Sequence, residues 1–484
     1  MRSDAPLAAT AALGCVLTGC ALGGCSLAPR YERPATASAG PAYRELRDWK
    51  VATPSDNVAR GLWWSMFHDE QLDALEAEAT LGNQSLSAAL ARLEQARAQT
   101  RIARAAWLPA LGANASATRA RASGNAPNFP PGAQPITNDF TVGGDLGYEI
   151  DLFGRIRSTV ASARASQAAS GGDAAVLSLS VHAELASDYF ALRGLDAQQK
   201  LLDQTVADYA HALELTQNLY HGGAAALADV DEAEAQLETA RTQAEDTRLR
   251  RAQTEHAIAV LIGRPATDFH LEARPLPAEL PIPSVDPGLP SELLERRPDV
   301  AAAERRVAAA NAAIGVARAA YFPVFTLQAT AGLQSASSSN WLTAPSEFWS
   351  VGPQAVLTLF DAGLHAAQSA AAHAAYAEQV ANYRGTVLTA YREVEDNLAA
   401  LRQLERESVS QAAAVSAAQG ALDQANHRYR GGIVTYLEVV STENAALAAR
   451  LAAVDIETRR LGATVLLVRA LGGDWRSERA AYLR

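Results

Sequence analysis

Cysteine, lysine, aromatic residues and long hydrophobic runs are scarce in this 484-residue chain. The body has no cysteine, which excludes disulfides, zinc fingers and cysteine nucleophiles there, because all three cysteines lie in the first 25 residues. No later stretch reaches roughly 18 consecutive apolar residues, so no transmembrane helix is predicted. Lys50 and Lys200 are the only lysines, which we attribute to genome composition, and the net charge of −11 argues against nucleic acid as a partner. Few aromatics (6%) and much alanine favour long, closely packed helices over one large globular core.

The first 24 residues resemble a secretory signal peptide. Arg2 precedes a weakly apolar stretch that is too short and too rich in glycine for a spanning helix. Two tetrads resemble a lipobox, in which signal cleavage exposes a cysteine for acylation, and they end at Cys20 and Cys25. An ordinary signal peptide with incidental cysteines is the alternative. We expect an exported, lipid-anchored protein, with residues 25–62 as a tether.

The chain contains an internal repeat, which indicates a duplicated unit. Four landmarks recur in the same order, at separations of about 207 to 214 residues. The segment 102–109 returns as 316–323, both ending in proline, and Leu-Phe at 152–153 returns at 359–360. Tyr-His-Gly-Gly at 220–223 returns as Tyr-Arg-Gly-Gly at 429–432, and Ile262-Gly263 as Leu471-Gly472.

Each repeat is predicted to begin with a helix, over about 69–106 and 299–320, that ends at a proline. There the hydrophobic pattern changes from period 3.6 to period 2, which predicts strands. One face of the strands is apolar and the other carries acids, amides and hydroxyls. The predicted apolar positions are Phe140, Val142, Leu146, Tyr148, Ile150 and Leu152, then Phe325, Leu327, Ala329, Ala331 and Leu333, then Trp349, Val351, Ala355, Leu357 and Leu359. Residues 111–121 give the weakest of the four strands.

The strand lengths favour a membrane, since 9–11 tilted residues cross a bilayer. Two soluble hairpins with one wet face are the alternative. Four strands cannot close a barrel, and lipid does not tolerate open sheet edges. We therefore expect an α+β membrane protein in which three copies pool their strands into a twelve-stranded barrel.

Two proline-free stretches, 154–220 and 363–429, follow the strands and predict helices on the order of 100 Å long. Such helices need a coiled-coil-like bundle. Glycine pairs should end both helices before return helices over 227–262 and 437–471, and these are Gly222, Gly223, Gly431 and Gly432.

These signals divide the chain. The predicted segments are a signal peptide 1–24, a tether 25–62, a first repeat 63–263 (helix, β-hairpin 108–153, helix hairpin 154–263), a proline-rich extended linker 264–298, a second repeat 299–472 (helix, β-hairpin 323–360, helix hairpin 363–472) and a tail 473–484.

Taken together, the motifs resemble those of TolC-like outer-membrane factors, specifically NodT-type outer-membrane efflux lipoproteins of resistance-nodulation-division tripartite systems. The segment 25–34 is similar to the acylated N-terminus of that family, which favours Cys25 over Cys20. The segments 63–69 and 290–299 match the openings of its two repeats, and 429–432 with 436–439 fits its periplasmic turn. The resemblance covers essentially the whole mature chain.

The resemblance implies a homotrimer whose twelve-stranded barrel in the outer membrane continues as a twelve-helix tunnel in the periplasm. A periplasmic adaptor and an inner-membrane pump would dock at the tunnel tip, and cargo would leave without chemical change. No cofactor, metal or catalytic site is expected, and the residues agree, since no Walker-type glycine loop or metal-ligand spacing is present.

In relatives, a constricting leucine and an aspartate ring close the tunnel near the second turn. Leu437 matches the leucine, whereas Ser441 stands at the aspartate position, so an acidic ring at that level is in doubt. Other carboxylates near the turns could form a cation-favouring ring or be simple solvated acids. They are Glu438, Glu443, Asp229, Asp231 and Glu232. Arg430 is expected to pair with a neighbouring carboxylate and latch the tip.

Three functions fit these patterns: an export duct for small toxic molecules, which we favour, a duct for secreted proteins or heavy metals, and a structural coiled-coil lipoprotein or adhesin. The last explains the helices but not strands placed identically in both repeats. No constellation of residues supports an enzyme.

Overall fold

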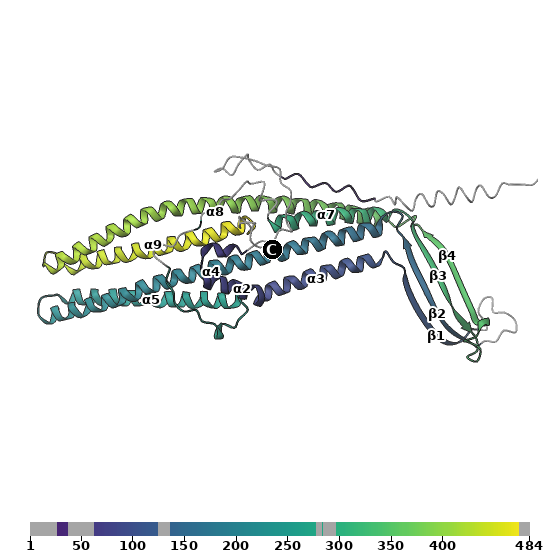
Figure 1. Cartoon of the computed structure of the whole chain (residues 1–484), viewed down its shortest axis with the longest axis horizontal. Helices are drawn as coiled ribbons and strands as arrows, with labels where there is room; N and C mark the ends of the chain where they lie inside the picture. Colours follow the sequence, from purple (N-terminus) through teal and green to yellow (C-terminus); the bar gives the residue numbers. More distant parts are fainter. Residues whose placement is uncertain (1–26, 37–61, 124–135, 277–282, 284–296, 474–484) are drawn as a thin grey trace, which may run out of the picture. The chain divides into compact units, whose positions relative to one another are not determined.

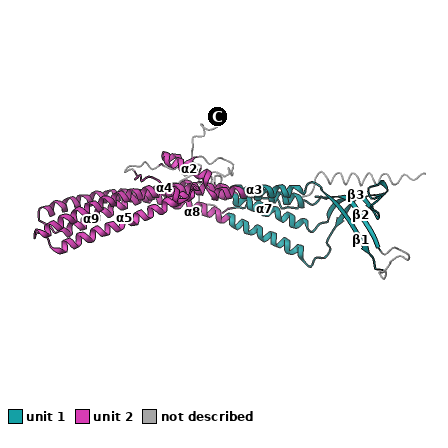
Figure 2. Ribbon diagram, turned by 90° about the horizontal axis from the view of Figure 1, so that it is seen from below, with its two compact units in different colours: residues 1–35, 92–171, 302–383 teal, residues 36–91, 172–301, 384–484 magenta. Residues whose placement is uncertain are grey.

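A computed structural model describes residues 27–36, 62–123, 136–276, 283 and 297–473. The predicted signal peptide, all three cysteines, most of the predicted tether and linker, and nearly all of the predicted tail lie outside the described residues. The chain forms two compact units, shown in Figure 2, and each contains segments from both sequence repeats. Unit 1 comprises residues 1–35, 92–171 and 302–383, and unit 2 comprises 36–91, 172–301 and 384–484.

Six helices of the described residues form three pairs of equal length, with one member from each repeat. They are α3 (Gln84–Ala105) and α7 (Pro298–Ala319) with 22 residues each, α4 (Arg155–His221) and α8 (Leu364–Arg430) with 67 each, and α5 (Leu227–Leu261) and α9 (Tyr436–Ala470) with 35 each. Shorter elements are η1 (Trp63–Phe67), α2 (Glu70–Gly82), η2 (Ala266–Asp268) and η3 (Ala344–Ser346). These matched lengths are what a duplicated chain should produce, and both predicted long helices are found within one residue of their expected ends.

Unit 1 contains one antiparallel sheet in the order β1-β2-β3-β4, whose strands lie side by side in Figure 1. They are β1 (Ala110–Arg121), β2 (Ile136–Ile150), β3 (Val324–Ser335) and β4 (Glu347–Val356). All four predicted strands are present. Two of them end earlier than predicted: Leu152 lies beyond β2, and Leu357 and Leu359 lie beyond β4, because alternation of apolar residues persists past the last ladder pairs.

The first predicted helix, 69–106, is interrupted at Asn83, so that expectation was wrong in one respect. Asn83 is extended, and its side chain accepts a hydrogen bond from the Leu86 N–H (2.9 Å) and donates one to the Leu261 carbonyl (2.8 Å). The backbone at Gly82 passes close to that at Gly263, where a Cβ would stand 2.1 Å from the Gly82 carbonyl oxygen. Contact with a distant segment therefore decides where this helix breaks.

The largest core in unit 2 joins η1, α2 and the middle of α4. Trp64 stacks on His182 at 4.6 Å, and His182 contacts Glu76 at 2.5 Å inside this core. Burial raises the pKa of Glu76 to about 7, although the histidine opposes the effect. Apolar side chains surround the pair, including Leu72, Leu75, Leu185, Ile258 and Val465.

Residues near the amino terminus pack on α7 within unit 1. The Tyr31 hydroxyl donates to a Glu304 carboxylate oxygen at 2.5 Å, and Asn311 donates to the Pro29 carbonyl at 2.9 Å. A Cβ on Gly315 would lie 2.6 Å from the Ala28 Cβ. The absence of a side chain at 315 thus permits the close approach of this segment.

Candidate functional site

Two helix turns in unit 2 carry most of the residues expected to act. At the end of α4, the Gly223 N–H donates to the Tyr220 carbonyl (2.9 Å) and the Ala224 N–H to the Leu219 carbonyl (2.8 Å). At the end of α8, Gly432 donates to Tyr429 (2.9 Å) and Ile433 to Arg428 (2.9 Å). Both helices therefore end in the same Schellman motif, in which the last carbonyls accept hydrogen bonds from the residues that follow.

The two glycines of each pair have different roles. Gly223 and Gly432 have φ values of +77° and +70°, a conformation that glycine adopts most easily. Gly222 and Gly431 are not in this region, and their N–H groups continue the helical pattern to Asn218 and His427. Only the second glycine of each pair is required by backbone geometry.

Near the turns, the second helix pair packs on the first. Tyr436, Val439 and Val440 of α9 are buried in one cluster with Ala233 of α5 and Ala425 of α8, and the partly buried Leu213 of α4 packs against it. Further along, Gln236 of α5 and Asn444 of α9 exchange two hydrogen bonds through their side-chain amides, at 2.6 and 3.1 Å. Side chains from all four helices therefore hold this end of unit 2 together.

The predicted residues on α9 have different environments. Leu437 is 57% exposed and Ser441 is also exposed, so both are available at the surface of this chain. Glu438 forms an ion pair with Arg428. Glu443 is half-buried, and burial together with the charge of Asp208 raises its pKa to about 7.

Arg430 is exposed and forms no ion pair among the described residues of this chain. The arginine that contacts a carboxylate at this turn is Arg428, which lies one turn or less from Arg430 on α8 and faces Glu438. The residue of the first repeat that corresponds to Arg428 is Leu219, so comparison of the two repeats does not point to an arginine at this position. An Arg430 latch within one chain is therefore not what this structure contains.

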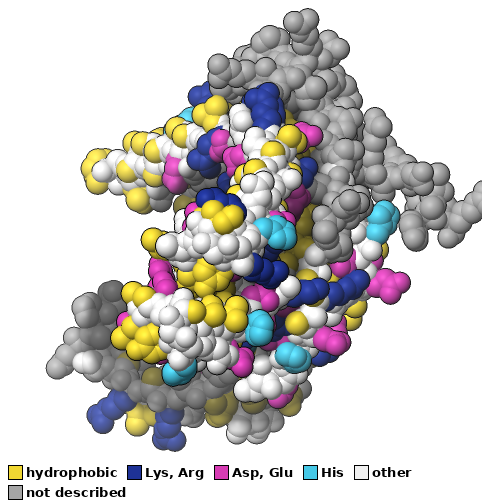
Figure 3. Space-filling model, turned by 90° about the vertical axis from the view of Figure 1, so that its left-hand side faces the viewer, with side chains coloured by type: hydrophobic (Ala, Val, Ile, Leu, Met, Phe, Trp, Pro, Cys, Tyr) yellow, Lys and Arg dark blue, Asp and Glu magenta, His cyan; other side chains and the backbone are white. Residues whose placement is uncertain are grey.

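The predicted acids of the first turn are spread along the start of α5. The Asp229 carboxylate accepts a hydrogen bond from the Ala226 N–H (3.0 Å), which satisfies an otherwise free donor at the helix start. Asp231 is exposed and Glu232 half-buried. Seen from the side where the turns lie, acidic, basic and histidine side chains are interspersed over the surface (Figure 3).

The sheet of unit 1 has the two chemically distinct faces that the alternation predicts. On the apolar face Leu111, Trp349 and Val351 are 81%, 76% and 62% exposed. On the other face, hydrogen bonds cross the strands between Gln328 and Gln354 (3.1 Å) and between Thr330 and Ser350 (2.8 Å). The outer edges of β1 and β4 pair with no strand among the described residues.

Ion pairs connect the end of β2 to the start of α4. Arg155 donates two hydrogen bonds to Glu149, at 2.7 and 2.6 Å, and Arg157 contacts Asp151 at 3.1 Å. The Asp151 carboxylate also accepts from the Ile156 and Arg157 N–H groups (3.0 and 2.9 Å), so it caps α4. The acids at this end of the polar face are thus neutralised by arginines of the adjoining helix.

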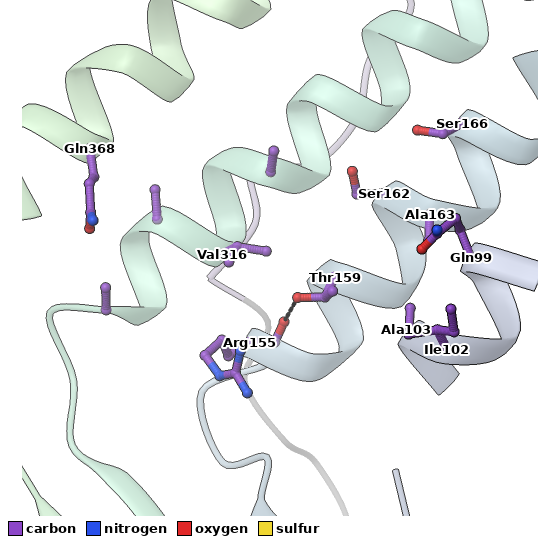
Figure 4. A pocket seen from close by; sticks show the side chains of 13 residues that line it. Gln99, Ile102, Ala103, Arg155, Thr159, Ser162, Ala163, Ser166, Val316 and Gln368 are labelled. Atoms are coloured by element: carbon purple, nitrogen blue, oxygen red, sulfur yellow. Dashed lines mark hydrogen bonds between the residues drawn. The ribbon is translucent and has the colours of Figure 1, made fainter. Parts of the chain in front are cut away.

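A groove of about 720 Å³ lies among α3, α4, α7 and α8 in unit 1 (Figure 4). Small residues dominate its lining, and the Thr159 hydroxyl there is already donated to the Arg155 carbonyl at 2.9 Å. The larger side chains that reach it are Gln99, Ile102, Arg155, Val316 and Gln368. A lining of this composition offers few strong interactions to a molecule in the groove.

Within the described residues, no group of three or more histidine, cysteine, aspartate or glutamate side chains is placed to hold a metal ion. Among the helices of that part of the chain, none is both long and apolar enough to cross a bilayer.

Sequence comparison matches the family described as "Outer membrane efflux protein" over residues 75–264 and 289–473. Among curated proteins, the chain is 35% identical over 453 residues to outer membrane protein OprJ of Pseudomonas aeruginosa, covering 93% of each chain. It is 30% identical over 459 residues to cation efflux system protein CusC of Escherichia coli, covering 93% of this chain and 95% of that one. The solved structure of the Campylobacter jejuni CmeC outer membrane channel superposes with a TM-score of 0.86 at 25% identity, covering 93% of this chain and 95% of CmeC.

Proposed function

Because the chain belongs to the outer membrane efflux protein family, we propose that it is the outer-membrane channel of a tripartite efflux pump. It would be a passive conduit through which small toxic compounds such as drugs, dyes and detergents leave the cell. The energy would come from an inner-membrane pump joined to the conduit by a periplasmic adaptor. The chain itself performs no reaction in this proposal and needs no cofactor.

The observation that carries this proposal is the four-stranded sheet with one exposed apolar face, one polar face and two unpaired edges. Open edges are not tolerated in lipid, so the edge of β1 in one copy must pair with the edge of β4 in another. Three copies supply twelve strands, above the minimum of about eight for such barrels. The apolar face would then contact outer-membrane lipid and the polar face would line water.

The helices would continue the conduit into the periplasm. The groove among α3, α4, α7 and α8 fits a tunnel wall, since its small side chains leave the passage open. At the turns, three copies of Leu437 would form the constriction. The surrounding ring would be supplied by Glu438, Ser441, Asp229, Asp231 and Glu232.

In the assembled trimer, Arg430 would pair with a carboxylate of a neighbouring copy and hold the tip closed. Arg430→Ala should therefore raise the conductance of single channels in planar lipid bilayers. Arg428→Ala is the comparison, because it removes the ion pair with Glu438 within one chain. It therefore distinguishes the effect of that ion pair from the effect of Arg430. If Arg430→Ala conducts no more than the wild type, the latch between copies does not exist.

We further propose that residues 1–24 are removed as a signal peptide and that Cys25 is then acylated. The mass of the mature amino-terminal peptide tests this directly. A diacylated or triacylated Cys25 supports the proposal. A peptide that begins at Cys20 would place the lipid on Cys20 instead, and an unmodified terminus would refute the lipid anchor. The Cys25→Ala variant should remain in the membrane fraction, since the proposed barrel would insert into the outer membrane without the lipid.

A growth-inhibition panel on a deletion strain tests the function as a whole. Sensitivity to several unrelated organic compounds, restored by the gene, is the expected result. Sensitivity to copper or silver alone would instead favour metal export, the activity in the name of the CusC relative. Unchanged sensitivity together with a protein missing from the culture supernatant would favour protein secretion.

A further inference from the structure

Helix α9 packs on the first helix pair through one stripe of side chains, and one position of that stripe is ionisable. Tyr436, Val440 and Leu447 are buried at intervals of one or two turns. Glu443 occupies the turn between Val440 and Leu447 and is itself half-buried. An amphipathic helix places apolar residues at this spacing, so a carboxyl at 443 departs from the pattern.

Within the part of the chain that the structure describes, Glu443 forms no ion pair with a cation. Its buried Oε2 atom has no hydrogen-bond partner among the described residues. The hydroxyl of Tyr209 on α4 is also buried and makes no well-formed hydrogen bond there, although the Gln236 side chain lies close enough to lower the pKa of Tyr209. The nearby Gln236 amide is turned to Asn444, with which it exchanges two hydrogen bonds. The titratable groups that interact with Glu443 are Asp208 and Tyr209 of α4 and Tyr436 of α9. Glu232 of α5 and Tyr429 of α8 act on Tyr436.

None of those groups is a cation. Arg428, an arginine at this turn, forms its ion pair with Glu438. Burial, and then the charge of Asp208, raises the pKa of Glu443 to about 7. Burial, and to a smaller extent the charges of Glu443 and Asp208, raise the pKa of Tyr209, while the Gln236 side chain opposes the shift. A neutral carboxyl fits this site, whereas an ionised one is buried beside another acid.

The repeat supplies an internal comparison. Glu234 on α5 precedes Glu443 by 209 residues, the separation of the turn glycines Gly223 and Gly432. Glu234 is exposed. The same residue at the same position of the repeat is thus exposed in one copy and half-buried in the other.

We propose that Glu443 is a proton-controlled contact that holds α9 against α4 and α5 while its carboxyl is neutral and loosens that contact when it ionises. In the channel proposed above, on which this consequence rests, loosening α9 would favour opening at the turns. No part of the contact depends on cargo or on a docked pump.

The direction follows from proton linkage. The packed state binds the proton more tightly than a state in which Glu443 is solvated, where the ordinary pKa of 4.5 applies. The stabilisation is therefore fully present below about pH 4.5 and is lost as the pH rises through about 7. The equilibrium between packed and loosened states can change by up to tenfold per pH unit in this window, on the order of a hundredfold in total.

Amide hydrogen exchange on the full-length protein in detergent, followed between pH 5 and 8 and corrected for intrinsic exchange, measures this contact. In the wild type, protection of residues 436–447 should fall by on the order of tenfold or more as the pH rises. Glu443→Gln should keep the protection high at every pH, and Glu443→Leu, which completes the apolar stripe, should do the same. The matched control Glu234→Gln should behave as the wild type does.

Retention of the wild-type pH dependence in Glu443→Gln would overturn the proposal, as would a wild type whose protection does not change with pH. Bilayer conductance separates this result from the proposed function. Conductance should rise with pH in the wild type and stay low in Glu443→Gln. Absence of any conductance while the exchange still depends on Glu443 would refute the channel and leave the contact standing.

Discussion

Replacing Gly432 by alanine should loosen the end of α8. The left-handed conformation of Gly432 (φ +70°) brings the Cβ of an L-residue close to the following carbonyl, at a cost of roughly 1–2 kcal/mol. The surrounding space does not add to this cost, because a Cβ at 432 would meet no atom within 4 Å. The expected effect is therefore conformational and shifts local opening by about 5- to 30-fold.

Hydrogen exchange of peptides covering residues 427–433 measures that opening directly. The hydrogen bonds at risk are those from the Gly432 and Ile433 N–H groups to the Tyr429 and Arg428 carbonyls. Gly431→Ala is the matched control: its Cβ would stand 3.5 Å from the Arg428 carbonyl oxygen, an ordinary contact, and its backbone is not left-handed. That variant should show no acceleration.

Gly432→Asn provides a second comparison, since asparagine tolerates this conformation better than alanine does. It should therefore exchange more slowly than Gly432→Ala. Equal acceleration in the Gly431 and Gly432 alanine variants, or none in Gly432→Ala, would refute the assignment of different roles to the two glycines. The pair Gly222 and Gly223 should repeat the outcome in the first copy.

Three further predictions concern positions away from the turns. Asp69 caps α2 by accepting from two backbone N–H groups (3.0 and 3.1 Å), so Asp69→Ala should weaken the first turn of that helix by about 1–2 kcal/mol, seen as faster exchange over residues 70–74. Gly315→Ala would bring a Cβ within 2.7 Å of both Ala28 and the Ser158 hydroxyl and should release residues 28–33 to proteolysis. If residues 28–33 are no more susceptible to proteolysis in Gly315→Ala than in the wild type, the packing argument is contradicted. At Gly385 a Cβ would meet no atom within 4 Å, so Gly385→Ala should instead stabilise α8 by roughly 0.5–1 kcal/mol.

Sequence patterns predicted the elements of this chain well because their signals are local. Proline at 109 and 323 stops the preceding helices, and a change to period 2 follows each proline. Glycine pairs locate both long turns to the residue. The strand ends were less well predicted, since Leu152 and Leu359 continue the alternation after the last ladder pair.

The candidate site was predicted in outline only. Its location at the turns followed from the repeat and the resemblance, and Leu437 and Glu438 lie there. Within one chain the arginine that pairs with a carboxylate at this turn is Arg428, whereas the pairing of Arg430 stays a prediction for the trimer. The sequence does not separate the two arginines, because residues two apart on a helix differ in the direction they face. Tyr209, some 230 residues before Glu443, could not be connected with it from the sequence.

The sequence by itself determined the duplication, the helix lengths, the turn positions and the two faces of the strands, because each depends on residues close together in the chain. Tertiary structure alone decided the break at Asn83, which needs the backbone of Gly263 beside Gly82. It also decided that Glu443 is enclosed while Glu234 is solvated. The two glutamates have the same position in their repeats, and only the side chains brought against them by other helices set whether their charge is exposed to water.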